Sequence, residues 1–284
     1  MSNNNSNGVA QRCYFLSRNF KLSYLDTHPN DSSRETILFL HGFPDSADMW
    51  QPQLNAMVEA GFRCIAPDTL SCGESEIVDA VGAYNAMLIA GDSIALLDHL
   101  GIEKVNVAGH DWGAILAWLV TAHYPERVLR LVAMSVGHPK AYLSSGFGQL
   151  LAGWYTMMFK IPGLSESILM SDSRLGLRRW ANLHPDVNGV HQRMLQPGKL
   201  TAALNIYRAS LPGLLFKEHP HVCCPTLGIW SNKDKYLIEG QMQKSDRFVD
   251  ARWRYASVDC GHWISLDKPD WLNAQLLEHF SDNK

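Results

Sequence analysis

The stretch that most constrains the fold of this chain runs from Val105 to Ala114 and reads Val-Asn-Val-Ala-Gly-His-Asp-Trp-Gly-Ala. Its short apolar start predicts a buried strand, and a helical pattern follows it as far as His123. The turn between strand and helix is sharp, so small residues are needed at both of its glycine positions. The sequence therefore predicts that Asp111 lies at a tight bend, at the N-terminus of a helix.

Asp111 has two interpretations at this position. A residue flanked by glycines between a strand and a helix is the pattern of a nucleophile elbow, here with a carboxylate in place of the usual serine. The dipole and free amides of the helix N-terminus favour the ionised form of such a carboxylate. Asp is also a frequent helix cap, so the motif alone leaves a capping role open.

The remainder of the chain alternates strand-like and helical segments. Most of the strand-like runs are short and apolar on both faces, as in a parallel sheet buried between helices. Asp92–Leu100 has the apolar spacing of a helix. We therefore expect an α/β fold with a mostly parallel, twisted sheet flanked by helices. The predicted strands are Thr36–Leu40, Arg63–Ala66, Val105–Ala108, Leu129–Ser135, Thr226–Ser231 and Arg252–Val258.

The alternation stops over residues 140–217. This stretch has helical patterns interrupted by Pro-Gly and His-Pro pairs, and no convincing strand. We expect a core domain formed by residues 1–139 and 218–284, with residues 140–217 inserted as a helical cap that ends at Pro212-Gly213. The helices predicted for the cap are Gln149–Phe159, Ser173–Leu183 and Leu200–Ala209.

The composition excludes several classes of partner. The 284 residues include 25 Lys and Arg and 28 Asp and Glu, and the resulting net charge of −3 does not suit nucleic-acid binding. No apolar run approaches the roughly 18–20 residues of a membrane-spanning helix. Met1–Gln11 is rich in Asn and Ser and lacks the basic and apolar regions of a signal peptide. We expect a cytoplasmic protein with no membrane span and a small, weakly charged substrate.

The sequence gives no sign of a metal or an organic cofactor. The six cysteines include no Cys-x-x-Cys pair, and we expect them to be reduced thiols. His-Glu-x-x-His, Walker and Rossmann glycine motifs are all missing from the sequence. The expected chemistry therefore depends on side chains and backbone amides alone.

Three further segments favour a catalytic role for Asp111. One predicted strand ends in the tight turn His-Gly-Phe-Pro, where the backbone N–H of Phe43 can face the elbow. With the N–H of Trp112, which directly follows Asp111, it would form an oxyanion hole. Asp234 and His262 each follow a later predicted strand. The order nucleophile, acid, histidine is that of the α/β-hydrolases.

Taken together, these motifs resemble the α/β-hydrolase-fold epoxide hydrolases and the related haloalkane dehalogenases. The resemblance extends from about Phe20 onward and rests on Gly-His-Asp-Trp-Gly-Ala, His-Gly-Phe-Pro-Asp, Lys-Asp and Cys-Gly-His-Trp-Ile-Ser-Leu-Asp-Lys-Pro. It implies an enzyme that converts a hydrophobic epoxide to a vicinal diol. Asp111 would form a covalent alkyl ester, and His262, oriented by Asp234, would activate the water that hydrolyses this ester.

Epoxide opening calls for acidic O–H donors, which in epoxide hydrolases are usually two cap tyrosines. The segment Leu-Asn-Ile-Tyr-Arg around Tyr207 resembles the one that carries the second of them. Met158 stands at the position of the first, counted back from Pro162-Gly163, and has no proton to give. Tyr155 lies three residues earlier on the same helix face and is a candidate substitute, with core packing as the alternative.

Other functions stay open. A haloalkane dehalogenase would use the same triad with indole donors for the halide, for which Trp112 and Trp154 are candidates. A dehalogenase acting on a haloacid would have Arg directly after the nucleophile, where this chain has Trp112. A hydrolase-fold protein that binds a ligand without turnover is a different class, and the complete triad argues against it. We expect a monomer or homodimer whose further substrate contacts come from His41, Trp154, Met158 and Trp263.

Overall fold

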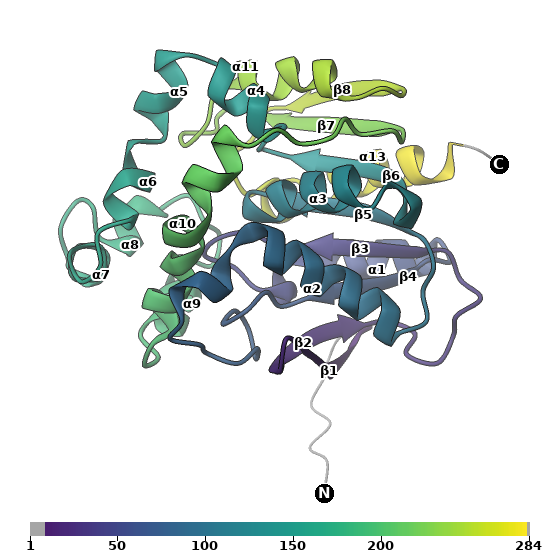
Figure 1. The fold of residues 1–284 in the computed structure, drawn as a ribbon, viewed down its shortest axis with the longest axis horizontal. Helices are drawn as coiled ribbons and strands as arrows, with labels where there is room; N and C mark the ends of the chain where they lie inside the picture. Colours follow the sequence, from purple (N-terminus) through teal and green to yellow (C-terminus); the bar gives the residue numbers. More distant parts are fainter. Residues whose placement is uncertain (1–8, 283–284) are drawn as a thin grey trace, which may run out of the picture.

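The computed structural model describes residues 9–282, apart from the side chains of residues 147, 150, 212 and 215. Most of the Asn- and Ser-rich segment at the start of the chain therefore lies outside the described residues. Within residues 9–282 the strands form one sheet in the order β1-β2-β4-β3-β5-β6-β7-β8 (Figure 1). The strands are β1 (Gln11–Ser17), β2 (Phe20–Asp26), β3 (Thr36–Leu40), β4 (Arg63–Pro67), β5 (Val105–His110), β6 (Val128–Met134), β7 (Thr226–Ser231) and β8 (Trp253–Val258).

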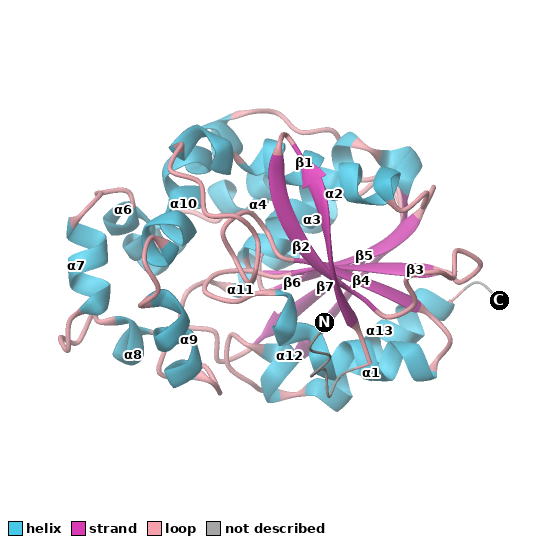
Figure 2. Cartoon of the chain, turned by 90° about the horizontal axis from the view of Figure 1, so that it is seen from below, coloured by secondary structure: helices cyan, strands magenta, loops and turns pink. Residues whose placement is uncertain are grey.

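The sheet is parallel except at one edge. β1 pairs with β2, and β2 with β4, in antiparallel orientation, whereas the other neighbouring strands are parallel. The fanned strands in Figure 2 show the twist of the sheet. Every predicted strand is present, with its ends within two residues of the prediction. The predicted α/β fold with a mostly parallel, twisted sheet is therefore confirmed.

The two antiparallel strands were not predicted from the sequence. β1 lies at the edge of the sheet, most of its residues are at least partly exposed, and polar residues break its apolar pattern. In β2, Lys21 and Ser23 likewise interrupt the apolar residues. An edge with one solvated face does not need the continuous apolar run that marks a buried parallel strand.

Helices cover both faces of the sheet. Alternate residues of β3 pack on opposite sides, Leu38 and Leu40 in one apolar core and Ile37 and Phe39 in the other. The first core contains residues of α2 and α3, and the second contains residues of α1 and α13. These helices are α1 (Gln51–Glu59), α2 (Ala86–His99), α3 (Trp112–His123) and α13 (Pro269–Ser281).

Between β6 and β7 the chain forms a run of helices, here called the α4–α10 segment (residues 139–216). Figures 1 and 2 both place these helices together at one end of the sheet. They are α4 (Pro139–Ser144), α5 (Phe147–Ala152), α6 (Trp154–Phe159), α7 (Leu164–Met170), α8 (Leu177–Trp180), α9 (Val187–Met194) and α10 (Lys199–Phe216). The short helices α11 (Glu239–Gln243) and α12 (Ile264–Asp267) follow β7 and β8, and 3₁₀ turns span Ala47–Trp50, Val81–Tyr84, Pro125–Arg127 and Lys244–Phe248.

The helical patterns predicted for this segment were only partly right. Gly153 divides the predicted helix Gln149–Phe159 into α5 and α6. Only α8 is helical within Ser173–Leu183, where Gly176 packs so closely on the carbonyl of Ser171 that a Cβ would overlap it. Pro212-Gly213 does not end the last helix of the segment, as the pattern predicted, because α10 continues through both residues to Phe216. In the part of the chain that the structure describes, every helix is too short or too polar to cross a bilayer.

Candidate active site

Asp111 lies at a strained bend between β5 and α3. Its backbone has φ 55° and ψ −121°, a left-handed conformation that non-glycine residues rarely adopt. The flanking glycines allow this bend because there is no room for a side chain at either position. A Cβ at Gly109 would overlap the carbonyl of Gly113, and a Cβ at Gly113 would overlap the carbonyl of Leu40. The sharp turn predicted from the sequence is therefore present, with Asp111 at its tip.

Two backbone amides hydrogen-bond to the Asp111 carboxylate. The N–H of Phe43 donates to Asp111 Oδ1 at 2.9 Å, and the N–H of Trp112 also hydrogen-bonds to this carboxylate. The loop after β3 can approach so closely because its residue 42 is glycine; a Cβ there would overlap Asp111 Oδ1. The two amides predicted to form an oxyanion hole therefore converge on Asp111.

The other oxygen of Asp111 faces His262. The distance from His262 Nε2 to Asp111 Oδ2 is 3.7 Å, and His262 Nδ1 lies 2.6 Å from Asp234 Oδ2. Asp234 follows β7 and His262 follows β8, so the parallel pairing of these strands brings both to the same edge of the sheet. The N–H of Tyr236 donates to the second Asp234 oxygen at 2.8 Å, which fixes the orientation of the carboxylate. The three residues predicted as a triad lie together.

The surroundings shift the pKa values of this pair. Burial raises the pKa of Asp111, while His262 and the two backbone amides oppose the rise. Burial alone would lower the pKa of His262, but the charge and hydrogen bond of Asp234, together with the charges of Asp111 and Asp45, outweigh this effect, and the pKa is raised. His262 is therefore a stronger base than an isolated imidazole because Asp234 stabilises its protonated form.

His110 supports His262 and was not singled out from the sequence. Its ring centroid lies 4.7 Å from that of His262, and its Nε2 is 2.8 Å from the carbonyl oxygen of His262. Burial lowers the pKa of His110 to about 3, with His262 adding to the effect. The ring is therefore neutral, and its Nε2–H donates to that carbonyl. The only sequence signal was its place beside Asp111 in the elbow.

Trp263, predicted to contact substrate, lines neither of the two cavities described below. The side chain is fully buried, and its indole N–H donates to Asp45 Oδ2 at 3.0 Å. The other Asp45 oxygen lies 3.0 Å from Nε2 of His184, which belongs to the α4–α10 segment. The Trp263 ring packs edge-on against His262 at 5.1 Å. Trp263 therefore packs behind the imidazole of His262.

An apolar cavity of about 490 Å³ opens beside the Asp111 carboxylate. Three tyrosines from separate helices line it: Tyr142 of α4, Tyr155 of α6 and Tyr207 of α10. Burial raises the pKa of Tyr155 and of Tyr207 well above the ordinary value, so both hydroxyls are protonated at neutral pH. The remaining lining residues are Trp112, Ile115, Val136, Pro139, Thr156, Leu211, Leu214 and Leu237.

A second cavity of about 410 Å³ lies against the same elbow. Trp112 lines both cavities, and Phe43 lines only the second. His41, predicted to contact substrate, also lines the second cavity, and its Nε2 accepts a hydrogen bond from the N–H of Thr69 at 3.1 Å. The ring of Tyr207 packs edge-on against both Trp112 and Phe43, at 5.0 Å and 5.7 Å. Aromatic rings therefore separate the two cavities.

Two predicted substrate contacts lie away from both cavities. Trp154 is 47% exposed, and Met158 is half-buried against the apolar core. Neither lines a described cavity, because Tyr155 and Thr156 form the side of α6 that faces Asp111. Tyr142 was missed because no motif distinguishes it from a packing tyrosine. Among residues 9–282, no cluster of three or more His, Cys, Asp or Glu side chains is arranged to hold a metal ion.

Comparison with known proteins identifies the family. The family described as "alpha/beta hydrolase fold" matches residues 35–269. The AB hydrolase superfamily protein YfhM of Bacillus subtilis is 30% identical, covering 95% of this chain and 98% of its own length. Epoxide hydrolase 4 of Mus musculus is 27% identical, covering 96% and 80%.

The fold is shared with solved structures as well. The crystal structure of epoxide hydrolase A from Mycobacterium thermoresistibile superposes with a TM-score of 0.81 at 22% identity, covering 96% of this chain and 98% of that one. The predicted resemblance to the epoxide hydrolases is confirmed by these comparisons. The chain therefore belongs to the α/β hydrolase fold family, and it is a hydrolase.

Proposed function

We propose that this protein is an epoxide hydrolase that forms a covalent ester on Asp111. The observation that carries the proposal is the position of the Asp111 carboxylate. One of its oxygens is bound by the amide of Phe43, the other faces His262, and both adjoin a cavity lined by protonated tyrosines. Relatives named as epoxide hydrolases support the choice of substrate class.

In the first step, Asp111 Oδ2 attacks a carbon of the epoxide ring. This oxygen is free to react because Oδ1 is the one that accepts the Phe43 N–H. As the carbon–oxygen bond of the ring breaks, a tyrosine hydroxyl donates its proton to the departing oxygen. A carboxylate suits this displacement at an alkyl carbon because it needs no base to activate it.

In the second step, His262 accepts a proton from water, and the resulting hydroxide attacks Cγ of Asp111. The negative charge develops on Oδ1, the oxygen that accepts the N–H of Phe43, and the N–H of Trp112 also hydrogen-bonds to this carboxylate. The bond from Cγ to the alkylated oxygen then breaks, and His262 supplies the proton for the departing diol. The second proton of the water remains on the Asp111 carboxyl group and returns to the tyrosinate, so that both side chains recover their starting states. Asp234 stabilises the imidazolium that forms in between.

Tyr207 and Tyr155 are the proposed proton donors for ring opening. Both hydroxyls belong to the wall of the cavity that contains Asp111, and the charge of Asp111 contributes to both raised pKa values. In the family the residue that matches position 158 is the first tyrosine donor. Because this chain has Met158 there, Tyr155 would donate the proton instead. The α4–α10 segment supplies both donors, so we propose that residues 140–217 act as the cap of the site and residues 1–139 and 218–284 as the core domain.

Halide release has weaker support. It would need indole N–H groups directed into the cavity, but the Trp112 side chain hydrogen-bonds to Tyr207, and Trp154 lies on the surface. A role in binding without turnover is also less well supported, because the Asp111, His262 and Asp234 arrangement has no purpose in a passive receptor.

The proposal is tested by assaying the purified protein against matched pairs of substrates, such as styrene oxide with phenethyl bromide. We expect diol formation from apolar epoxides and no bromide release above the background rate. Release of bromide without diol formation would show that the protein is a haloalkane dehalogenase instead. Turnover of neither epoxides nor haloalkanes across a broad panel would favour a protein that binds its ligand without turnover.

A further inference from the structure

The outer side of the α4–α10 segment carries a row of exposed apolar side chains that the proposed reaction does not use. Met157, in α6, is 65% exposed, and Ile161, in the connection to α7, and Leu164, at the start of α7, are each about half exposed. Single exposed apolar residues are common on protein surfaces, whereas a contiguous group marks an interaction site. The neighbouring exposed apolar side chains are Leu151, Trp154 and Leu175.

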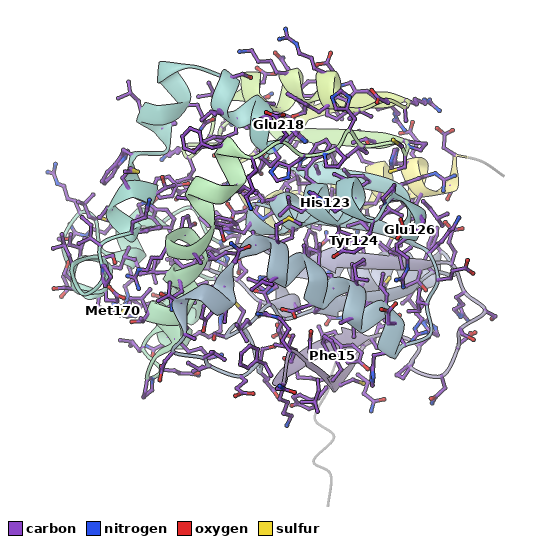
Figure 3. The ribbon with its side chains drawn as sticks, viewed as in Figure 1. Phe15, His123, Tyr124, Glu126, Met170 and Glu218 are labelled. Carbon is purple, nitrogen blue, oxygen red and sulfur yellow. The ribbon has the colours of Figure 1, made fainter. Side chains whose placement is uncertain are left out.

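These residues belong to the end of the molecule that lies farthest from the sheet. Helices α6, α7 and α8 form this end in Figures 1 and 2, and Met170 at the end of α7 marks it in Figure 3. On the inner side of α6, Tyr155 and Thr156 line the cavity beside Asp111. Helix α6 is therefore the wall between the exposed apolar row and the cavity.

This end of the molecule carries a net positive charge although the whole chain is acidic. Residues 154–180, from the start of α6 to the end of α8, contain four Lys and Arg against two Asp and Glu, a net charge of +2. They belong to the stretch 140–217, whose net charge is +6, while the remaining residues of the chain have a net charge of −9. Arg174 lies just before α8, Arg178 and Arg179 lie within it, and all three are exposed. None of the three forms an ion pair with a residue of the described range 9–282.

We propose that the α6–α8 end docks on the surface of an anionic lipid bilayer. Apolar side chains that enter the interface and basic side chains that meet acidic headgroups are the two contributions to peripheral membrane binding. Trp154 is a residue type that favours this interface. The core, with its net charge of −9, is repelled by the same surface. The protein would therefore bind with α6–α8 toward the lipid and the sheet away from it.

A second copy of the chain fits this surface less well. A two-fold contact brings the same patch of both copies together, so the arginines around α8 would face each other at the interface. An anionic bilayer instead complements them. The proposal goes beyond the proposed reaction and does not depend on it.

Flotation of the full-length protein with vesicles tests the proposal without any substrate. Vesicles of phosphatidylcholine alone are compared with vesicles that also contain phosphatidylglycerol. We expect binding to be at least about tenfold stronger to the anionic vesicles and to weaken as salt is added. Failure to bind either vesicle, or equal binding to both, would overturn the proposal.

Two sets of variants locate the surface. Met157→Ser with Ile161→Ser removes apolar contacts, and Arg174→Glu with Arg178→Glu reverses charges; each pair is expected to lower vesicle binding about tenfold. If the serine pair fails to fold, the charge-reversal pair decides, because both of its side chains are exposed.

The matched controls lie at other places on the core. Leu16, on β1 next to the Phe15 labelled in Figure 3, is 73% exposed, and Lys104 is exposed just before β5. Leu16→Ser and Lys104→Glu are expected to leave binding unchanged. Equal losses in the controls, or a dimer that the α6–α8 variants dissociate while vesicle binding stays the same, would contradict the assignment.

Discussion

The carboxyl edge of the sheet and the α4–α10 segment build the same cavity in different ways. At the sheet edge the backbone decides the geometry, because Asp111 lies on a bend between glycines that cannot carry a Cβ, within 2.9 Å of the Phe43 amide. The α4–α10 segment contributes tyrosine side chains from three separate helices. Rigid backbone geometry leaves a short motif in the sequence, whereas side chains gathered from separate helices do not.

The largest loss of activity is expected from a substitution at the sheet edge, Asp234→Asn. The variant should lose about 10³–10⁴-fold in turnover, since the proton-accepting His262 loses the carboxylate that orients it. The ester-hydrolysis rate should also change its pH dependence. His262 must be neutral to accept a proton, and Asp234 raises its pKa, so the wild-type rate rises with pH through a point above 6.5, the ordinary value of histidine.

In the variant the two contributions of Asp234 are lost, while burial, the largest effect on His262, still lowers its pKa, so the same rise should move to lower pH than in the wild type. Single-turnover rates measured across pH check both parts. An unchanged pH midpoint would show that Asp234 does not control the base.

Loss of a cap tyrosine should have a smaller effect. Tyr207→Phe and Tyr155→Phe are each expected to slow ester formation by about 10–10²-fold, and the double variant by more, because one donor partly covers for the other. Rapid-quench measurement of ester formation with an epoxide separates this step from hydrolysis. Tyr142→Phe is the matched control within the same cavity; if it alone abolished ester formation, the donor assignment would move to Tyr142.

Two glycine substitutions compare how the sheet edge and the α4–α10 segment contribute to the free energy of unfolding. Gly113→Ala should destabilise the fold by about 1–3 kcal/mol, since its Cβ overlaps the carbonyl of Leu40. Gly213→Ala adds a Cβ within α10 where no heavy atom lies within 4 Å, and should stabilise by about 0.4–1 kcal/mol. Denaturant unfolding of both variants measures the difference. Similar values for the two would remove the contrast between a crowded sheet edge and a looser helical segment.

The smallest effect is expected from Met158→Tyr. This change restores the residue that family resemblance places at position 158, yet the side chain there is half-buried against the core and lines neither cavity. We expect less than about a twofold change in kcat, because a phenol that cannot reach the epoxide donates no proton. A large gain in rate would mean that position 158 turns toward Asp111 in the working enzyme.

These contrasts explain what could be predicted from the sequence. Most of the parallel strands were found because they are apolar on both faces, and Asp111, Asp234 and His262 because each follows a predicted strand. β1 was missed because an exposed edge strand lacks that pattern. Tyr142 and His110 were missed because their importance arises only from packing, and the exposure of Trp154 could not be predicted because a helical pattern alone does not fix which side faces the core.

The covalent ester on Asp111 is tested most directly by a single turnover in ¹⁸O-labelled water, with enzyme in excess over an epoxide substrate. We predict that the first diol carries the unlabelled oxygen of Asp111, and that mass spectrometry of the digested protein finds the label in the Asp111 side chain. Label in the first diol, with Asp111 unlabelled, would mean that water attacks the epoxide directly and would contradict the account.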